Sequence, residues 1–154
     1  MDLGFPLGGL IGWIDYEGDY TFGEFPEILV FDHASDRWFE VGRLSDEIRD
    51  LNETHLPDPH PPTNFRDSVT PSQYCSMVER AREYIASGDI YQVNLSHRFE
   101  ARWHGDRKAL LSLYHRLRQV SPAPYSAFLN IGERTILSSS PEQFLRISGR
   151  SIET

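Results

Sequence analysis

The sequence has little sulfur and no long apolar run. Its 154 residues include one cysteine, Cys75, so no disulfide can form within the chain, which fits a reducing cytosol. The first residues, Met1 to Gly4, place no basic segment ahead of an apolar one, so we expect no signal peptide. No stretch reaches the ~18 apolar residues of a membrane span. We therefore predict a cytoplasmic protein with no membrane partner.

Basic residues are also few. Fifteen Lys and Arg stand against 23 Asp and Glu, which gives a net charge of −8. Nucleic acids and anionic membranes attract basic surfaces, so this balance argues against both and predicts no nucleic-acid partner. The six histidines show no close spacing of the HxxxH kind, so the sequence predicts no zinc site and supplies no other set of metal ligands.

The first third of the chain reads as strands followed by a linker. Gly9 to Tyr16 and Glu27 to His33 have the composition of strands, and Arg37 to Val41 alternates like a strand that closes a hairpin with the second. Leu44 to Leu51 is compatible with a short helix. The four prolines between Leu56 and Pro62 prevent helix and inner-strand pairing, which indicates an extended linker.

The clearest helix begins after Thr70. Thr70 can cap it, with Gln73 three residues later as in a capping box, and Gly88 is placed to end it. Ile90 to Phe99 alternates like a strand, with Gln92 on its polar face. A second helix is expected to start at Asp106 and to break at Ser121–Pro124, and three further strands are expected at Tyr125–Ile131, Thr135–Ser139 and Phe144–Ile147.

This order predicts an α+β fold rather than a regular βαβ alternation. We expect three parts: residues 1–51 as the end of a β-rich N-terminal region, 52–69 as a proline-rich linker, and 70–154 as the first part of a second domain. Cys75 lies beside Tyr74 and Met77 on the predicted helix, which favours a buried or inert thiol.

Two polar residues are the candidates for chemistry. Glu142 follows Ser140–Pro141 at a strand-to-loop junction, where a carboxylate can project into a cleft. Gln92 is a neutral amide in an otherwise apolar strand. Taken alone, Glu142 is more often a solvated surface group, and Gln92 is more often a structural amide than a substrate contact.

Three blocks of the sequence carry a resemblance. GDIYQVNLSHRF (Gly88–Phe99), SPAPYSAF (Ser121–Phe128) and SSSPEQF (Ser138–Phe144), the last continued by SIET, resemble the motifs of the chorismate-binding enzyme family in their order and spacing. That family includes anthranilate synthase, aminodeoxychorismate synthase, isochorismate synthase and salicylate synthase. The resemblance implies part of a layered antiparallel β-sandwich with helices, lacking its C-terminal half.

The resemblance also implies roles for both candidates. Glu142 is placed as the general acid that protonates the hydroxyl leaving chorismate, since hydroxide is a poor leaving group. The family members that add water carry a lysine base where this chain has Gln92, and an amide cannot act as a base at neutral pH. Gln92 is therefore expected in the substrate pocket of an enzyme that uses ammonia.

The branch of the family is a finer question. The forms YQVNL and APYSAF resemble the aminodeoxychorismate synthase component I branch, of para-aminobenzoate and folate biosynthesis, more than the anthranilate synthase component I branch of tryptophan biosynthesis. In both branches the second block can line a tryptophan pocket, whose contacts here would be Pro124, Tyr125 and Ser126. The alternatives are anthranilate synthase component I and a non-catalytic remnant that binds tryptophan or a partner subunit.

The family pattern continues after IET with a block R-P-I-K-G-T or R-P-I-A-G-T, and then with glutamates that hold Mg²⁺. We therefore expect Mg²⁺ in the intact enzyme, with ligands beyond this chain, and a glutamine amidotransferase subunit as the ammonia-supplying partner. We expect these 154 residues alone to be nearly inactive, to expose apolar strand edges and to self-associate.

Overall fold

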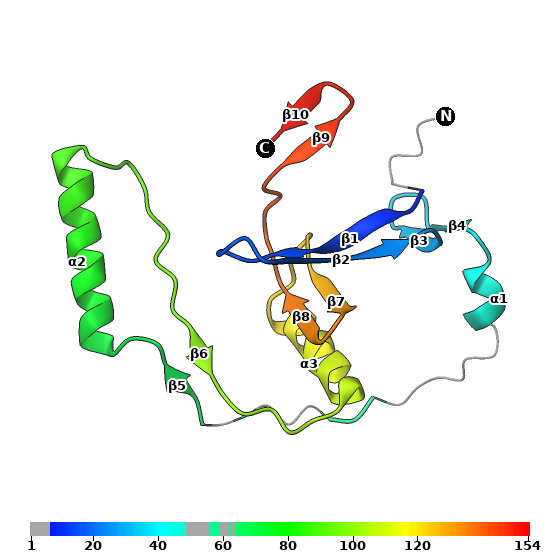
Figure 1. Ribbon diagram of the computed structural model, residues 1–154, viewed down its shortest axis with the longest axis horizontal. Coiled ribbons are helices and arrows are strands. Elements are labelled where there is room, and N and C mark those ends of the chain that lie inside the picture. The colour runs from blue at the N-terminus through cyan, green and yellow to red at the C-terminus, as the bar shows by residue number, and fades with distance from the viewer. Residues whose placement is uncertain (1–6, 49–55, 59–61, 63) are drawn as a thin grey trace.

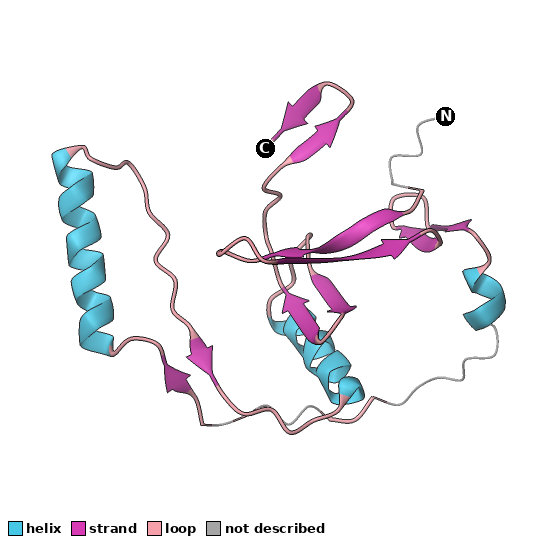
Figure 2. Ribbon diagram, in the orientation of Figure 1, coloured by secondary structure: helices cyan, strands magenta, loops and turns pink. Residues whose placement is uncertain are grey.

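The computed structural model describes residues 7–48, 56–58, 62 and 64–154. These residues form three helices and five two-stranded antiparallel sheets, so the predicted α+β class is confirmed (Figures 1 and 2). None of the described helices is long and apolar enough to cross a bilayer. The predicted division into residues 1–51, 52–69 and 70–154 stays a prediction.

The N-terminal hairpin pairs β1 (Gly9–Ile14) with β2 (Tyr20–Phe25). Its turn is closed twice, because the Asp19 N–H donates to Asp15 Oδ1 at 2.9 Å and the Asp15 N–H donates to the Asp19 carbonyl at 2.8 Å. The strand expected at Gly9 to Tyr16 is confirmed. Its partner β2 was not predicted, because Gly23 interrupts the pattern of apolar residues that marks a strand.

The second hairpin follows the prediction closely. β3 (Ile28–Asp32) pairs with β4 (Arg37–Val41) across a turn in which Asp36 has a φ of 54°. α1 (Leu44–Ile48) comes next, and the last residues of the predicted helix, 49–51, lie outside the described part of the chain. Of the proline-rich linker expected at 52–69, the structure describes residues 56–58, 62 and 64–69. Arg66–Asp67 form a short strand, and the other described residues of this stretch belong to no helix or strand.

The segment from residue 64 to residue 102, here called the arm, holds β5 (Arg66–Asp67), α2 (Pro71–Ser87) and β6 (Phe99–Glu100). In Figure 1 it reaches away from the other hairpins. The ends of α2 are those predicted, since Thr70 and Gln73 form a complete capping box and Gly88 ends the helix in a left-handed conformation with a φ of 83°.

The strand expected from Ile90 to Phe99 is wrong over most of its length. Only Phe99 and Glu100 pair, with β5, while Tyr91 to Arg98 run without a strand ladder. The Ser68 N–H donates to the Arg98 carbonyl at 2.8 Å, and the Arg98 N–H returns to Ser68 Oγ at 3.1 Å. The described part of the chain offers the segment before Arg98 no partner strand, and alternation alone cannot make a sheet.

The C-terminal part contains α3 (Arg107–Val120), β7 (Ala127–Ile131), β8 (Arg134–Ser138), β9 (Arg146–Ser148) and β10 (Ser151–Glu153). Asp106 caps α3 as predicted, through a bond from the Ala109 N–H at 2.9 Å. α3 packs on the β7–β8 hairpin, where the rings of Tyr114 and Phe128 lie 5.6 Å apart. β2 contacts β7, so the N-terminal hairpin lies beside this unit (Figure 1).

The described residues bury little apolar surface. None of their hydrophobic side chains is buried, and Ser112 on α3, which is 4% exposed, is the one buried residue among them. The accessible surface is 13,516 Å², whereas a compact monomer of this length exposes about 8,000 Å². The expected exposure of apolar strand residues is therefore confirmed. Self-association stays a prediction.

Candidate functional site

Two loops far apart in sequence meet beside β7 and β8. The first, residues 121–126, joins α3 to β7, and the second, residues 139–143, follows β8. Ser139 Oγ donates to the Ser121 carbonyl at 2.5 Å and lies 3.2 Å from Ser121 Oγ. The Tyr125 N–H donates to the Ser140 carbonyl at 3.1 Å, and the Tyr125 hydroxyl donates to Gln143 Oε1 at 3.3 Å. The second and third of the recognised sequence blocks are thus bonded to each other.

Glu142 lies inside this bonded pair of loops. It follows Pro141, and its carbonyl accepts a bond from Ser140 Oγ at 3.1 Å. Its side chain is exposed. A carboxylate held on a short loop and open to solvent can protonate or deprotonate a bound solute, provided that the loop keeps it in place.

The three predicted tryptophan contacts do not face one hollow. Ser126 lines a hollow of about 350 Å³ whose wall is shared with His115, Arg118 and Gln119 of α3, whereas Pro124 and Tyr125 do not line it. Ser126 Oγ also donates to the Ala123 carbonyl at 2.8 Å, which holds the first loop together. The tryptophan pocket stays a prediction for these three residues.

Gln92 lies on the arm, on the unpaired segment between α2 and β6, and its side chain is exposed. Figure 1 places this segment far from the link between β8 and β9 that carries Glu142. The described residues therefore do not bring the two candidates together.

The apolar side of that segment faces α2. Met77, Ala81 and Tyr84 of α2 line an almost wholly apolar groove of about 420 Å³ together with Val93 and Leu95. Gln92 and Asn94 are not in the lining, as the predicted alternation requires, but Tyr91, which the alternation places on the apolar face, is 91% exposed. Cys75 on α2 is exposed, so of the two alternatives, a buried or an inert thiol, the buried one is wrong and inertness stays a prediction. The cause is that the described residues cover only one side of α2.

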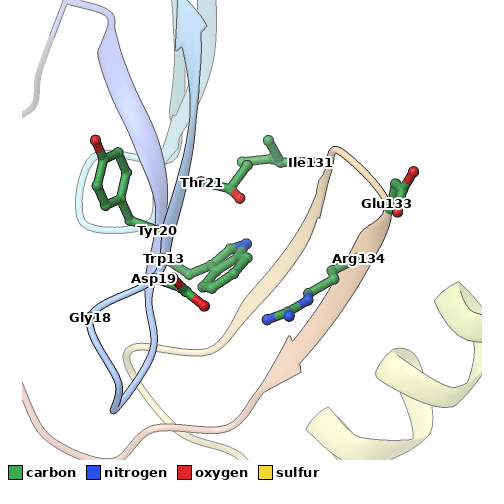
Figure 3. A pocket seen from close by; sticks show the side chains of 8 residues that line it. All are labelled: Trp13, Gly18, Asp19, Tyr20, Thr21, Ile131, Glu133 and Arg134. Atoms are coloured by element: carbon green, nitrogen blue, oxygen red, sulfur yellow. The ribbon is translucent and has the colours of Figure 1, made fainter.

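A further hollow, of about 410 Å³, lies between the turns of β1–β2 and β7–β8 (Figure 3). The Arg134 guanidinium lies 4.7 Å from the centre of the Trp13 ring and 3.7 Å from Asp15 Oδ2. Thr21, Ile131 and Glu133 complete much of its wall. Sequence reasoning missed this contact, because nothing in either segment indicates that residues 13 and 134 meet.

Metal ligands are not gathered in the described part of the chain. Among residues 7–48, 56–58, 62 and 64–154, no three His, Cys, Asp or Glu side chains come together closely enough to hold an ion. These residues therefore do not fit a Mg²⁺ site, and Mg²⁺ enters no step below.

The sequence is similar to those of known proteins. A family model described as chorismate binding enzyme matches residues 8–154. Anthranilate synthase component 1 of Methanothermobacter thermautotrophicus is 34% identical over 168 aligned residues, which cover 96% of this chain and 35% of that protein. Aminodeoxychorismate synthase component 1 of Escherichia coli is 38% identical over 92 residues, which cover 60% of this chain and 20% of that protein.

The fold also has a solved counterpart. The crystal structure of anthranilate synthase component I from Streptococcus pneumoniae superposes with a TM-score of 0.75 at 23% identity, over 95% of this chain and 41% of that one. The chain thus spans about a third of the length of the first of these relatives, and the likeness in structure concerns the fold alone.

Proposed function

We propose, since this chain belongs to the chorismate-binding enzyme family, that its residues contribute to an enzyme that aminates chorismate, as component I of an anthranilate synthase. The observation that carries the proposal is the joining of two recognised blocks around Glu142, through Ser139 and Tyr125. Whole-chain relatives support the branch, since proteins named anthranilate synthase component 1 align with 96% of this chain at 34%, 32% and 28% identity.

Aminodeoxychorismate synthase component I is the second candidate. It is the branch that the forms YQVNL and APYSAF favour, and a relative of that name is 38% identical over 92 residues. That alignment covers 60% of this chain, and a second relative of that name, from Salmonella typhimurium, is 31% identical over 88% of it. The anthranilate synthase of Methanothermobacter thermautotrophicus matches more of the chain at a higher identity than the Salmonella protein, so the comparisons support the anthranilate branch better than the branch expected from the motifs. The reading frame after Thr154 separates the two, since R-P-I-A-G-T favours the first and R-P-I-K-G-T the second.

The chemistry assigns one role to each candidate residue. Glu142, in its protonated form, donates a proton to the departing hydroxyl of chorismate, so that the C–O bond breaks with release of water. Ammonia supplies the electron pair of the new C–N bond and needs no base before it attacks, and the ammonium group so formed loses one proton to solvent. Elimination of the enolpyruvyl group as pyruvate, with loss of a ring proton, then gives anthranilate. Gln92, which cannot act as a base, donates or accepts a hydrogen bond to the substrate. This role requires Gln92 to lie closer to Glu142 in the whole enzyme than it does among the described residues. Ammonia comes from a glutamine amidotransferase subunit, and Pro124, Tyr125 and Ser126 contact tryptophan where it binds.

The test uses the protein expressed from its full reading frame, with chorismate, ammonium and Mg²⁺. Anthranilate is followed by its fluorescence, and aminodeoxychorismate by its conversion to para-aminobenzoate with added lyase. We expect anthranilate from the wild type and a loss of roughly 10²- to 10⁴-fold in kcat for Glu142→Gln. Glu133→Gln is the matched control, because Glu133 is an exposed glutamate in the β7–β8 turn.

Three other assay results would change the proposed function. Para-aminobenzoate in place of anthranilate favours the second candidate. Addition of water to chorismate, without an amine product, contradicts amination. Tryptophan binding without any turnover of chorismate leaves only the non-catalytic alternative.

A further inference from the structure

We propose that Ser139 and Tyr125 are positioning residues that fix the loop of residues 139–143 and thereby set where the Glu142 carboxyl can reach. Together with their partners Ser121 and Gln143 they are called the loop clamp below. The proposal rests on the proposed role of Glu142. It goes further by naming the side chains on which that role depends.

The clamp holds the loop at three points. Ser139 Oγ donates to the Ser121 carbonyl at 2.5 Å at the start of the loop. The Tyr125 N–H donates to the Ser140 carbonyl at 3.1 Å, and its hydroxyl donates to Gln143 Oε1 at 3.3 Å at the far end. Glu142 lies between the second and third points. Pro141, whose ring restricts φ, stands directly before it.

The other side of the clamp is built on regular structure. Ser121 caps the C-terminus of α3, where its N–H donates to the Leu117 carbonyl at 2.8 Å. Tyr125 stands two residues before β7, and Ser126 between them is bonded back to Ala123 at 2.8 Å. The first loop is therefore anchored to a helix end and a strand start, and sites supported by such elements hold their geometry better than free loops.

Glu142 needs this support because its own side chain is exposed. A general acid works only within hydrogen-bond reach of the atom that takes its proton, and a displacement of about 1 Å can cost a hundredfold in rate. The side-chain hydrogen bonds of Ser139 and Tyr125 therefore control the rate indirectly, by holding Glu142 in place. In this proposal neither Ser139 nor Tyr125 contacts the substrate.

Four variants of the full-length protein test the clamp in the absence of tryptophan. Ser139→Ala removes the first bond, and Ser139→Thr restores a hydroxyl. Tyr125→Phe removes the third bond and keeps the ring, while Tyr16→Phe is its control because that side chain is fully exposed at 104%. We expect kcat to fall roughly tenfold in Ser139→Ala and Tyr125→Phe, with KM changed by less than about twofold. Ser139→Thr should recover most of the rate.

One further measurement separates positioning from a general loss of structure. Amide hydrogen exchange of residues 139–143 should become faster in Ser139→Ala and Tyr125→Phe but not in Tyr16→Phe, while exchange in α3 stays unchanged.

The result overturning the clamp is unchanged exchange at residues 139–143, or a rise in KM with unchanged kcat. The exchange measurement decides this even if the wild type does not aminate chorismate. That failure would remove the proposed function and the catalytic purpose of the clamp, whereas faster exchange would still establish the clamp itself. Normal wild-type turnover with normal variants removes the clamp and leaves the proposed function standing.

Discussion

The arm and the paired hairpins of the body differ in how far apart in sequence their stabilising residues are. The body is here β1–β2, α3 and β7–β8. In the arm, α2 is set by neighbours: Gln73 is three residues from Thr70, and the Gly88 N–H donates to the Ile85 carbonyl at 3.2 Å. In the body, Arg134 lies on the ring of Trp13 and pairs with Asp15, more than a hundred residues earlier.

Parts of the chain that depend on neighbouring residues can form without a distant partner. The ends of α2, a capped helix of 17 residues, are determined mostly by residues within and next to the helix. The contact between β2 and β7 forms only after a long stretch of chain has been brought together, which costs loop-closure entropy. The segment 91–98 shows the intermediate case, since it has the alternation of a strand but no strand beside it.

The largest expected effect concerns Gly12 in β1. A Cβ at this position would overlap the carbonyl oxygen of Thr21 on the paired strand, so Gly12→Ala forces the two strands apart. We expect a loss of about 2–3 kcal/mol in the free energy of unfolding, which is the range of overpacked sites. Urea unfolding measures it, and faster hydrogen exchange in β2 with unchanged exchange in α2 would locate the damage in the body.

Gly18→Ala is the matched control in the same hairpin. Gly18 has a φ of 93°, but a Cβ there meets nothing within 4 Å. Its cost is therefore the backbone strain alone, about 1 kcal/mol. Equal costs for the two substitutions would contradict the close approach of β1 and β2 at Gly12.

Local sequence signals predicted the parts of the fold that depend on neighbours. Both ends of α2, the Asp106 cap of α3 and the hairpin of β3 with β4 are visible in the residue order, because their hydrogen bonds join residues close in sequence. β2 was missed, and the strand at Ile90 to Phe99 was placed where only Phe99 pairs. Pairing depends on a partner that lies elsewhere in the chain, and alternation does not report it.

The candidate site follows the same rule. Glu142 and the block of Pro124, Tyr125 and Ser126 were found by their resemblance to a family, while nothing in their order indicated that Ser139 bonds Ser121 or that Tyr125 bonds Gln143. The one available hint is the high serine content of the blocks SPAPYSAF and SSSPEQF. Serine hydroxyls readily donate hydrogen bonds to loop carbonyls, but the sequence does not indicate which carbonyl accepts the bond.

A smaller effect is expected at the start of the arm. Thr70→Ala removes the hydroxyl that accepts from the Gln73 N–H at 3.3 Å, and leaves the first turn of α2 with an unpaired donor. We expect a loss of about 1 kcal/mol in helix stability. Circular dichroism at 222 nm and hydrogen exchange in residues 71–76 measure it, and Thr70→Ser keeps the hydroxyl as the control. If exchange in β1–β2 rose as well, the arm and the body would not be independent.

The smallest effect tests whether a local turn outside the arm behaves as the arm does. The Ser35 hydroxyl, at 2.5 Å, and the Ala34 N–H, at 3.0 Å, donate to the Asp32 carboxylate and hold its pKa below the ordinary value. A pKa that is lower in the folded state stabilises the β3–β4 hairpin above the unfolded value of about 3.9, and the stabilisation disappears as the pH falls through the folded value. Asp32→Asn should therefore destabilise this hairpin slightly at pH 7 and hardly at all near pH 2.

Urea midpoints of Asp32→Asn at the two pH values measure this difference in stability. Asp36→Asn is the control, since asparagine also tolerates the positive φ of that residue. An equal deficit at both pH values would show that the hydrogen-bonding shape of Asp32, and not its charge, holds the turn.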